Sequence, residues 1–363
     1  MRILYISRAT LYSNPGGDTT QITNTASALR QLGVEVDIKL TDEKIDYTLY
    51  DLVHFFNIIR PADILYHTQK FQKPYVVSTI FVDYREAEKY AFTGLRKLLF
   101  SFLPIDIVEY AKVLARYVVN KEKVLSRYYI LHGHRRSVKK VIDNARLLLP
   151  NSHNEYARLS GHYKIQHPYK VIPNGIDRAL FSSKVHTNEL RDQRLILCVA
   201  RIEPLKNQLN LIRALHKTNF KLLLIGAPSV NQKGYYEKCR SEAGENVTFV
   251  NHIPQKELIR FYQKAAVHVL PSWFETTGLS SLEAASMGCN IVITDKGDTR
   301  EYFKDYAWYC DPASTDSIAA AINKAAAAPI NTALSNLVES NYTWEIAAQK
   351  TLQSYNEILF QGK

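Results

Sequence analysis

Metal-site and disulfide patterns are missing from this sequence of 363 residues. Its four cysteines form no C-x-x-C pair and show no zinc-ligand spacing. No stretch approaches the roughly 18 uncharged residues that a membrane-spanning helix needs, and the apolar run at the N-terminus is too short for a signal peptide. We therefore expect a protein of the reducing cytoplasm, without a metal site, and we interpret residues 2–7 as a first buried strand.

The dinucleotide fingerprint G-x-G-x-x-G is also missing, as are internal repeats and low-complexity tracts. Without that glycine loop, an NAD-dependent oxidoreductase is the weakest of the functions considered. No known nucleic-acid-binding module accompanies the positive charge, so we expect no nucleic-acid partner.

Positive charge is present in excess and is unevenly spread. The formal net charge is +11, and residues 84–150 hold 14 Lys and Arg against 6 Asp and Glu. Within this basic segment, residues 92–129 mix leucines and phenylalanines with arginines and lysines, which suits an amphipathic surface at anionic lipid. The same pattern fits helices with a core-facing apolar side and a solvated charged side. Peripheral attachment to the inner face of the plasma membrane therefore stays open.

Short apolar runs alternate with amphipathic helical patterns twice along the chain, which is typical of two doubly wound α/β domains. We expect a first Rossmann-like domain at residues 1–170 and a second at 171–342, with an amphipathic helix at 343–363 packing back on the first. The last five residues, LFQGK, resemble a protease-site scar and carry no weight. The expected strands are residues 2–7, 34–40, 52–56, 75–80 and 147–149 in the first domain, and 195–200, 221–225, 247–250, 267–270, 290–294 and 308–310 in the second.

The most informative stretch is PSWFETTGLSSLEAA at residues 271–285. A buried-strand pattern precedes it and helical spacing of apolar residues follows its glycine, so it predicts a strand–loop–helix corner. Glu275 lies on the loop and Glu283 on the helix. Both glutamates also have a purely structural interpretation. Glu275 is then ordinary negative charge at a helix start, and Glu283 is a buried structural carboxylate. The N–H groups of Thr277, Gly278 and Leu279 lie at the helix start. Open α/β folds bind phosphorylated ligands at such a position.

Two cations follow the first strand of the second domain, in the stretch ARIEPLKN. Arg201 and Lys206 there suit a diphosphate, because a departing nucleotide gains negative charge that fixed cations stabilise without a metal. The alternative is that both are solvated loop residues.

These motifs, with the PNGID turn at residues 173–177, occur in the order and spacing of the retaining glycosyltransferases of family 4, which the sequence resembles from about Pro173 to Glu301. Agreement is weaker at Gly16-Gly17 and at the helix that begins at Trp344. The resemblance implies the GT-B architecture, in which two Rossmann-like domains face each other across a cleft. It also implies transfer of a sugar from a nucleotide diphosphate to an acceptor.

The resemblance further implies roles for single residues of the second domain. Glu275 would bind hydroxyls of the donor sugar and Glu283 both ribose hydroxyls, while Arg201 and Lys206 bind the phosphates. A glycosidase with two catalytic carboxylates is disfavoured, because a hydrolase needs neither the cations nor two Rossmann-like halves.

The base pocket and the acceptor side rest on fewer residues. His252 and Ile253 look like base-pocket residues, although Asn251 replaces a glycine that the family usually has. In the first domain Gly16 and Gly17 let the backbone approach an acceptor closely before a helix. Many relatives have a histidine at the end of a later strand. The corresponding stretch here, STIFVDY at residues 78–84, has no histidine. Asp83 lies where its carboxylate could make a polar contact in place of that histidine.

We therefore expect a metal-independent retaining glycosyltransferase of the hexosyl-transferring type, which extends a glycan or lipid-linked acceptor. It would need no cofactor and would use a nucleotide-diphosphate sugar, a UDP-sugar first, as co-substrate. Two alternatives stay open: an isomerase (epimerase) of nucleotide sugars with the same fold, and a non-catalytic nucleotide-sugar binder.

Overall fold

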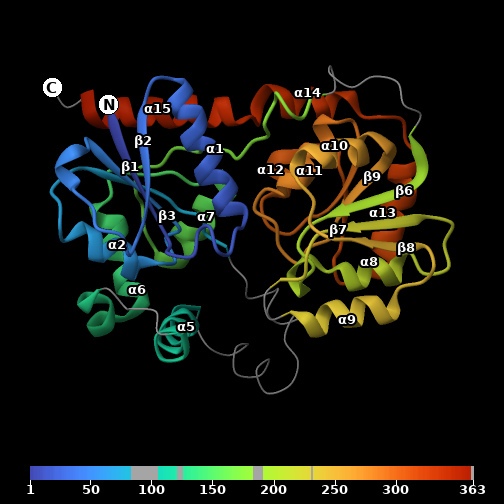
Figure 1. Ribbon diagram of the computed structural model, residues 1–363, viewed down its shortest axis with the longest axis horizontal. Coiled ribbons are helices and arrows are strands. Elements are labelled where there is room, and N and C mark those ends of the chain that lie inside the picture. The colour runs from blue at the N-terminus through green and yellow to red at the C-terminus, as the bar shows by residue number, and fades with distance from the viewer. Residues whose placement is uncertain (83–104, 121–125, 183–190, 230–231, 361–363) are drawn as a thin grey trace. The chain divides into compact units, whose positions relative to one another are not determined.

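The computed structural model describes residues 1–82, 105–120, 126–182, 191–229 and 232–360 (Figure 1). The chain divides into two compact units. Unit 1 comprises Met1–Asn174 with Trp344–Lys363, and unit 2 comprises Gly175–Thr343. Each unit has its own parallel sheet and its own hydrophobic core. The predicted class, α/β with two doubly wound units, is confirmed.

The sheet of unit 1 has five strands in the order β2-β1-β3-β4-β5, and every neighbouring pair is parallel. Its central strands are buried throughout, as expected for a sheet covered on both faces. The predicted strand 75–80 ends at Ser78, because Ile80 has a positive φ of 45° that no strand accommodates. The strands are β1 (Arg2–Ser7), β2 (Glu35–Leu40), β3 (Leu52–Phe56), β4 (Tyr75–Ser78) and β5 (Leu147–Leu148). The helices are α1 (Gly17–Gln31), η1 (Tyr47–Leu49), α2 (Pro61–Thr68), α5 (Ile105–Asn120), α6 (Arg127–Asn144), α7 (His153–Tyr163) and α15 (Trp344–Phe360).

The last helix, α15, returns from unit 2 and completes unit 1 beside α1 (Figure 1). Its Tyr355 is fully buried, and the phenol oxygen lies 2.6 Å from Nδ1 of His54 on β3. His54 Nε2 lies 2.8 Å from the Ser78 hydroxyl. Burial lowers the pKa of His54 to about 3, so the ring is neutral at physiological pH. A satisfied polar network therefore joins α15 to the centre of the sheet.

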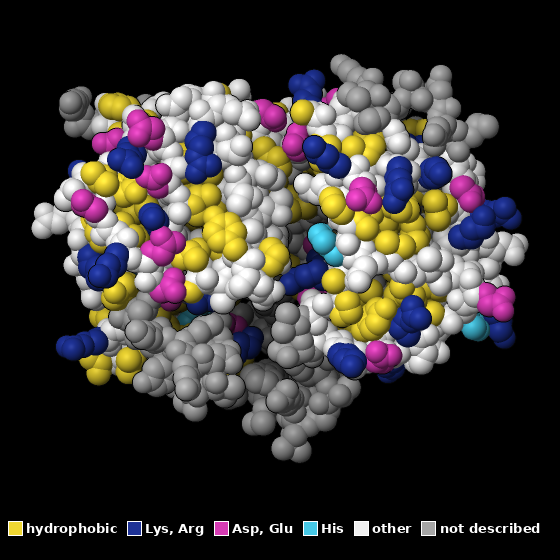
Figure 2. All heavy atoms as spheres, in the orientation of Figure 1, with side chains coloured by type: hydrophobic (Ala, Val, Ile, Leu, Met, Phe, Trp, Pro, Cys, Tyr) yellow, Lys and Arg dark blue, Asp and Glu magenta, His cyan; other side chains and the backbone are white. Residues whose placement is uncertain are grey.

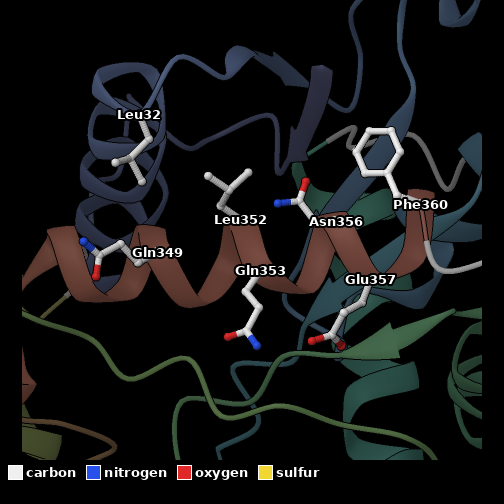
Figure 3. A pocket seen from close by; sticks show the side chains of 7 residues that line it. All are labelled: Leu32, Gln349, Leu352, Gln353, Asn356, Glu357 and Phe360. Carbon is white, nitrogen blue, oxygen red and sulfur yellow. The ribbon is translucent and has the colours of Figure 1, made fainter.

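An open groove of about 470 Å³ runs along α15, beside the end of α1 (Figure 3). Leu32, at the end of α1, and Leu352 line it, and Phe360 stands at its far end. Glu357 of the same groove forms an ion pair with Lys170. The groove is mixed in character and lies on unit 1.

The sheet of unit 2 has six parallel strands in the order β11-β10-β9-β6-β7-β8. Four predicted strands have the observed bounds, whereas β6 and β9 begin earlier than predicted. The strands are β6 (Asp192–Val199), β7 (Lys221–Ile225), β8 (Val247–Val250), β9 (Ala265–Leu270), β10 (Asn290–Thr294) and β11 (Trp308–Cys310). The helices are η3 (Pro204–Lys206), α8 (Gln208–Ala214), α9 (Lys233–Glu242), α10 (Gln255–Lys264), α11 (Leu279–Ser286), α12 (Thr299–Phe303), η4 (Lys304–Tyr306), α13 (Thr315–Ala327) and α14 (Thr332–Asn341).

The glycine of the PNGID turn has a packing reason at the start of unit 2. A Cβ on Gly175 would lie 2.3 Å from the carbonyl carbon of Thr343, so only glycine lets the two backbone segments pass. The next residue, Ile176, donates its N–H to the Tyr342 carbonyl at 2.9 Å. The first and last residues of unit 2 are thereby held together.

The predicted basic segment is described in part. Residues 83–104 and 121–125 lie outside the described residues, and α5 and α6 cover most of the rest. Within the described ranges, no helix combines the length and the apolar character that crossing a membrane requires.

Candidate functional site

Lys206 and Glu275 lie where the strand order of unit 2 reverses. The first strand of this sheet is β6, with β7 and β8 on one side and β9 on the other. Lys206 ends η3, in the loop after β6, and Glu275 lies in the loop after β9. Open α/β sheets bind ligands at such a reversal, outside the carboxyl ends of the strands. The topology thus brings together two residues that are 69 positions apart.

The two side chains form an ion pair. Lys206 Nζ lies 2.5 Å from Glu275 Oε1, and the Ser272 hydroxyl donates to the same oxygen, also at 2.5 Å. The exposed fractions are 7% for the Glu275 side chain and 20% for that of Lys206. Charge-assisted hydrogen bonds are strong when they are short and shielded from water. The carboxylate is therefore fixed in position with a cation directly beside it.

The loops that carry this pair are joined by hydrogen bonds. Trp273, after β9, donates its N–H to the Leu205 carbonyl of η3 at 2.9 Å. Asn207 is buried, and its Nδ2 donates to the Pro271 carbonyl at 3.1 Å. Its backbone has a positive φ of 59°, which asparagine tolerates better than most residues. The ion pair consequently rests on a frame that is fixed on both sides.

A third loop, after β10, reaches Glu275 through a glycine. Gly297 and Glu275 form an isolated parallel bridge, in which Asp298 donates its N–H to the Glu275 carbonyl at 2.9 Å. Gly297 has φ 96°, and a Cβ there would lie 2.0 Å from that carbonyl oxygen. No larger side chain fits unless the backbone of Glu275 moves.

Arg201 shares the loop of Lys206 but has another partner. Its guanidinium, with a side chain 48% exposed, lies 3.3 Å from Glu203 Oε1. Glu203 also accepts a hydrogen bond from Ser229, in the loop after β7. Exposed ion pairs contribute little free energy, so Arg201 can exchange Glu203 for an incoming anion at small cost.

Glu283, on α11, has two hydrogen-bond donors from α10. Tyr262 donates its hydroxyl and Gln255 its Nε2 to the carboxylate, each at 2.9 Å. Burial raises the pKa of Glu283 to about 7, although both hydrogen bonds act in the opposite direction. The carboxylate is therefore poised between its neutral and charged forms near physiological pH.

Gln255 connects Glu283 to the predicted base pocket. His252 is exposed, Ile253 packs against the core of unit 2, and both directly precede α10. Because Gln255 begins α10 and touches Glu283, the predicted ribose and base residues lie in the same part of unit 2.

The helix start of the predicted corner lies where the sequence indicates. Thr277 is buried, Gly278 is the N-cap with φ 73°, and Leu279 is the first residue of α11. Their roles toward a ligand stay predictions. Among the described residues, no cluster of three or more His, Cys, Asp or Glu could hold a metal ion.

We expect the pH dependence of stability to change in the variant Glu283→Gln. A carboxyl whose pKa is raised from 4.5 to about 7 by folding stabilises the protein fully below pH 4.5, and this contribution is lost as pH rises through 7. The loss is at most about 3 kcal/mol. The thermal unfolding midpoint of the wild type should fall between about pH 5 and about pH 8 more steeply than that of Glu283→Gln. Equal slopes would contradict this, and the exposed Glu245→Gln is the matched control.

The predicted acceptor residues belong to unit 1. Gly16 is the N-cap of α1 and Gly17 its first residue, with the Gly16 N–H donating to the Thr19 hydroxyl at 3.0 Å. Neither glycine has a positive φ, so backbone conformation alone does not require glycine there. Asp83 lies outside the described residues. The acceptor role of all three stays a prediction.

Our sequence interpretation missed three residues that position the site of unit 2: Ser272, Gln255 and Tyr262. Gln255 and Tyr262 are seven positions apart, hence on one face of α10, and that spacing was a usable signal. In unit 1 the interpretation also missed Arg8, which follows β1. Its guanidinium lies 2.7 Å from the Asp18 carboxylate of α1 and donates to the Asn14 carbonyl, in the loop before α1, at 2.9 Å. No spacing rule identifies Ser272, because a serine three residues before a glutamate is common in loops.

Comparison with known proteins gives the fold and a family match. Residues 182–343 match the family model described as Glycosyl transferases group 1. A D-inositol 3-phosphate glycosyltransferase of Pseudarthrobacter chlorophenolicus is 28% identical over 174 residues, which cover 44% of this chain and 41% of the relative. A glycogen synthase of Mycobacterium tuberculosis is 29% identical over 197 residues, covering 51% and 47%. The chain thus spans less than half the length of these two relatives.

Solved structures match along the whole chain. A sucrose-phosphate synthase from Thermosynechococcus elongatus has a TM-score of 0.76 at 18% identity, and the match covers 100% of both chains. Anabaena HepE in complex with UDP has a TM-score of 0.69 at 14% identity, covering 98% and 100%. At such identities the likeness shows the fold, and the GT-B class predicted from the sequence is confirmed.

Proposed function

We propose that the protein is a retaining glycosyltransferase that moves a sugar from a nucleotide-diphosphate sugar to a glycan or lipid-linked acceptor without a metal ion. The contact between Lys206 and Glu275 at the strand reversal carries this proposal. A cation suited to phosphate and a carboxylate suited to sugar hydroxyls lie side by side. A donor bound to both has its anomeric carbon, which joins sugar to phosphate, at the ion pair.

The chemical step follows from this placement. The acceptor oxygen forms a bond to the anomeric carbon on the face from which the phosphate leaves, and the carbon–oxygen bond to the phosphate breaks. The acceptor proton passes to the departing phosphate oxygen, so the configuration is retained. Lys206 and Arg201 stabilise the negative charge that develops on the phosphate, the task that a metal ion performs in other transferases.

The nucleotide is placed by the second set of residues. The buried carboxylate of Glu283 accepts hydrogen bonds from the ribose hydroxyls. Tyr262 and Gln255 hold this carboxylate in position. The segment before α10, with His252 and Ile253, borders the base. We propose a UDP-sugar as donor, in keeping with HepE, which is described in complexes with UDP and with UDP-glucose. The four cysteines are all free and buried, which suits the cytoplasm where we place the protein.

The test is a hydrolysis screen against UDP, GDP and ADP sugars without an acceptor. We expect slow release of UDP from one donor, unchanged by a chelator, and no release in Glu275→Ala. Conversion of the donor to an isomer would favour an epimerase instead. Tight donor binding without any release, even when acceptors are added, would favour a non-catalytic binder. Loss of activity with the chelator would overturn metal independence.

A further inference from the structure

Apolar side chains are exposed where α5 and α6 meet on unit 1. Leu131 is 79% exposed, Ile130 48% and Ile107 50%, and these are three of the nine large hydrophobic side chains exposed among the described residues. The two helices are in contact: Tyr110 of α5 donates its hydroxyl to the Ile130 carbonyl at 3.0 Å. Ile107 lies one turn before Tyr110, on the same side of α5. The exposed apolar residues thus belong to adjacent elements.

The conformation of α6 explains why its first turns expose leucine and isoleucine. Gly133 interrupts the helix with φ 74° and ψ −179°. Before this break Tyr129 is fully buried, and the next two residues, Ile130 and Leu131, are exposed. After the break Val138 and Val141 pack into the core of unit 1. The core of unit 1 is therefore closed without the two outward side chains.

Basic side chains surround these apolar residues. The α6 sequence has five Lys and Arg against one acidic residue, Asp143. Arg127 and Arg136 are exposed, and no described carboxylate lies within ion-pair distance of either. Lys140, one turn after Arg136, lies with Nζ 4.0 Å from the ring centre of Tyr128. Figure 2 shows basic and hydrophobic side chains next to each other over α6, at the lower left.

We propose that this α5–α6 patch, made of Ile107, Ile130, Leu131, Arg127, Arg136 and Lys140, binds an anionic lipid surface. Apolar side chains that enter the headgroup boundary, with cations around them, are what a peripheral membrane helix presents. The cations attract anionic headgroups, while the apolar side chains gain by leaving water. A nucleic-acid partner would use the cations but not the isoleucines and leucine, and an acidic protein partner is an outcome that the test separates.

The test is flotation of the full chain with vesicles of phosphatidylcholine mixed with phosphatidylglycerol, against vesicles of phosphatidylcholine alone. We expect binding to the anionic vesicles only, weakened by salt. Arg127→Glu/Arg136→Glu should lower partitioning at least about twentyfold, since each basic residue near the surface contributes about a fivefold factor. Ile130→Ser/Leu131→Ser should also abolish flotation while leaving the charge unchanged.

Two control variants match these changes elsewhere on the chain. Lys233→Glu/Lys238→Glu alters the net charge equally at exposed positions of α9, and Phe360→Ser removes a side chain that is 61% exposed at the α15 groove. Both should float like the wild type, and all variants should keep its unfolding midpoint. Absence of wild-type flotation, or equal loss in the controls, would overturn the proposal. Flotation needs neither donor nor acceptor, so a chain inactive in the hydrolysis screen can still pass this test.

Discussion

We expect Glu275→Ala to lower the turnover of the transfer reaction about 100- to 1,000-fold, the loss typical when one preorganised polar group is removed from an active site. The carboxylate is held by Lys206 and Ser272, so in its proposed role it would bind the donor sugar without reorganising. Removing it frees the sugar to rotate and leaves Lys206 without its partner. The measurement is kcat and KM for the donor identified in the hydrolysis screen.

Two further variants separate position from charge. Ser272→Ala removes one hydrogen bond to Glu275 but keeps the ion pair, and should lower kcat only about tenfold. Glu203→Gln changes a carboxylate in the same region that contacts Arg201 instead, and should leave kcat near that of the wild type. If Glu275→Ala is no slower than Glu203→Gln, Glu275 does not bind the sugar.

Lys206→Ala should weaken both donor binding and the fold of unit 2. In the proposed role of Lys206, loss of the cation would remove a phosphate contact, and we expect Kd for the nucleoside diphosphate to rise about 10- to 100-fold, as for a lost charge-assisted contact. It also leaves the nearly buried Glu275 unpaired, which costs about 3 kcal/mol of unfolding free energy. Calorimetric binding and thermal unfolding of the same preparation measure the two effects.

A second substitution combined with Lys206→Ala distinguishes the loss of nucleotide binding from the loss of stability. Lys206→Ala/Glu275→Ala removes both charges, so its unfolding midpoint should lie above that of Lys206→Ala alone. Arg201→Ala is the matched cation: it is exposed, so it should weaken nucleotide binding without lowering the midpoint. A Lys206→Ala variant that binds nucleotide as the wild type does would remove Lys206 from the phosphate site, whatever its stability.

The fold was largely predictable because strand and helix patterns are local. Buried parallel strands are continuous apolar runs, and four strands of unit 2 have the predicted bounds. The errors lie at strand ends, where backbone conformation or long-range pairing determines how far the strand extends. One example is β4, which ends before Ile80 because that residue has a positive φ. The start of β9 was placed two residues late, because Ala265 and Ala266 carry weak strand propensity and are strand only through pairing.

The candidate site was predictable to the extent that sheet topology determines it. Residues after β6 and β9 must meet if the strand order reverses between them, and Lys206 and Glu275 do. The partner of each side chain was not predictable: Arg201 pairs with Glu203, and Glu283 takes its donors from α10. Such choices depend on rotamers and on loop paths that spacing does not encode. The ligand roles stay predictions that the kinetic experiments decide.

Because α15 returns to unit 1, this unit is the first to be started during synthesis and the last to be completed. Unit 2 is one continuous stretch, whereas unit 1 lacks the Tyr355 contact with His54 until the end of α15 has been translated. Domains generally fold as units during synthesis. Unit 2 can therefore reach its native state on the ribosome while β1 and β3, made much earlier, still lack their contacts with Tyr355. We therefore expect unit 1 to be the part of the nascent chain that needs protection from aggregation during this interval.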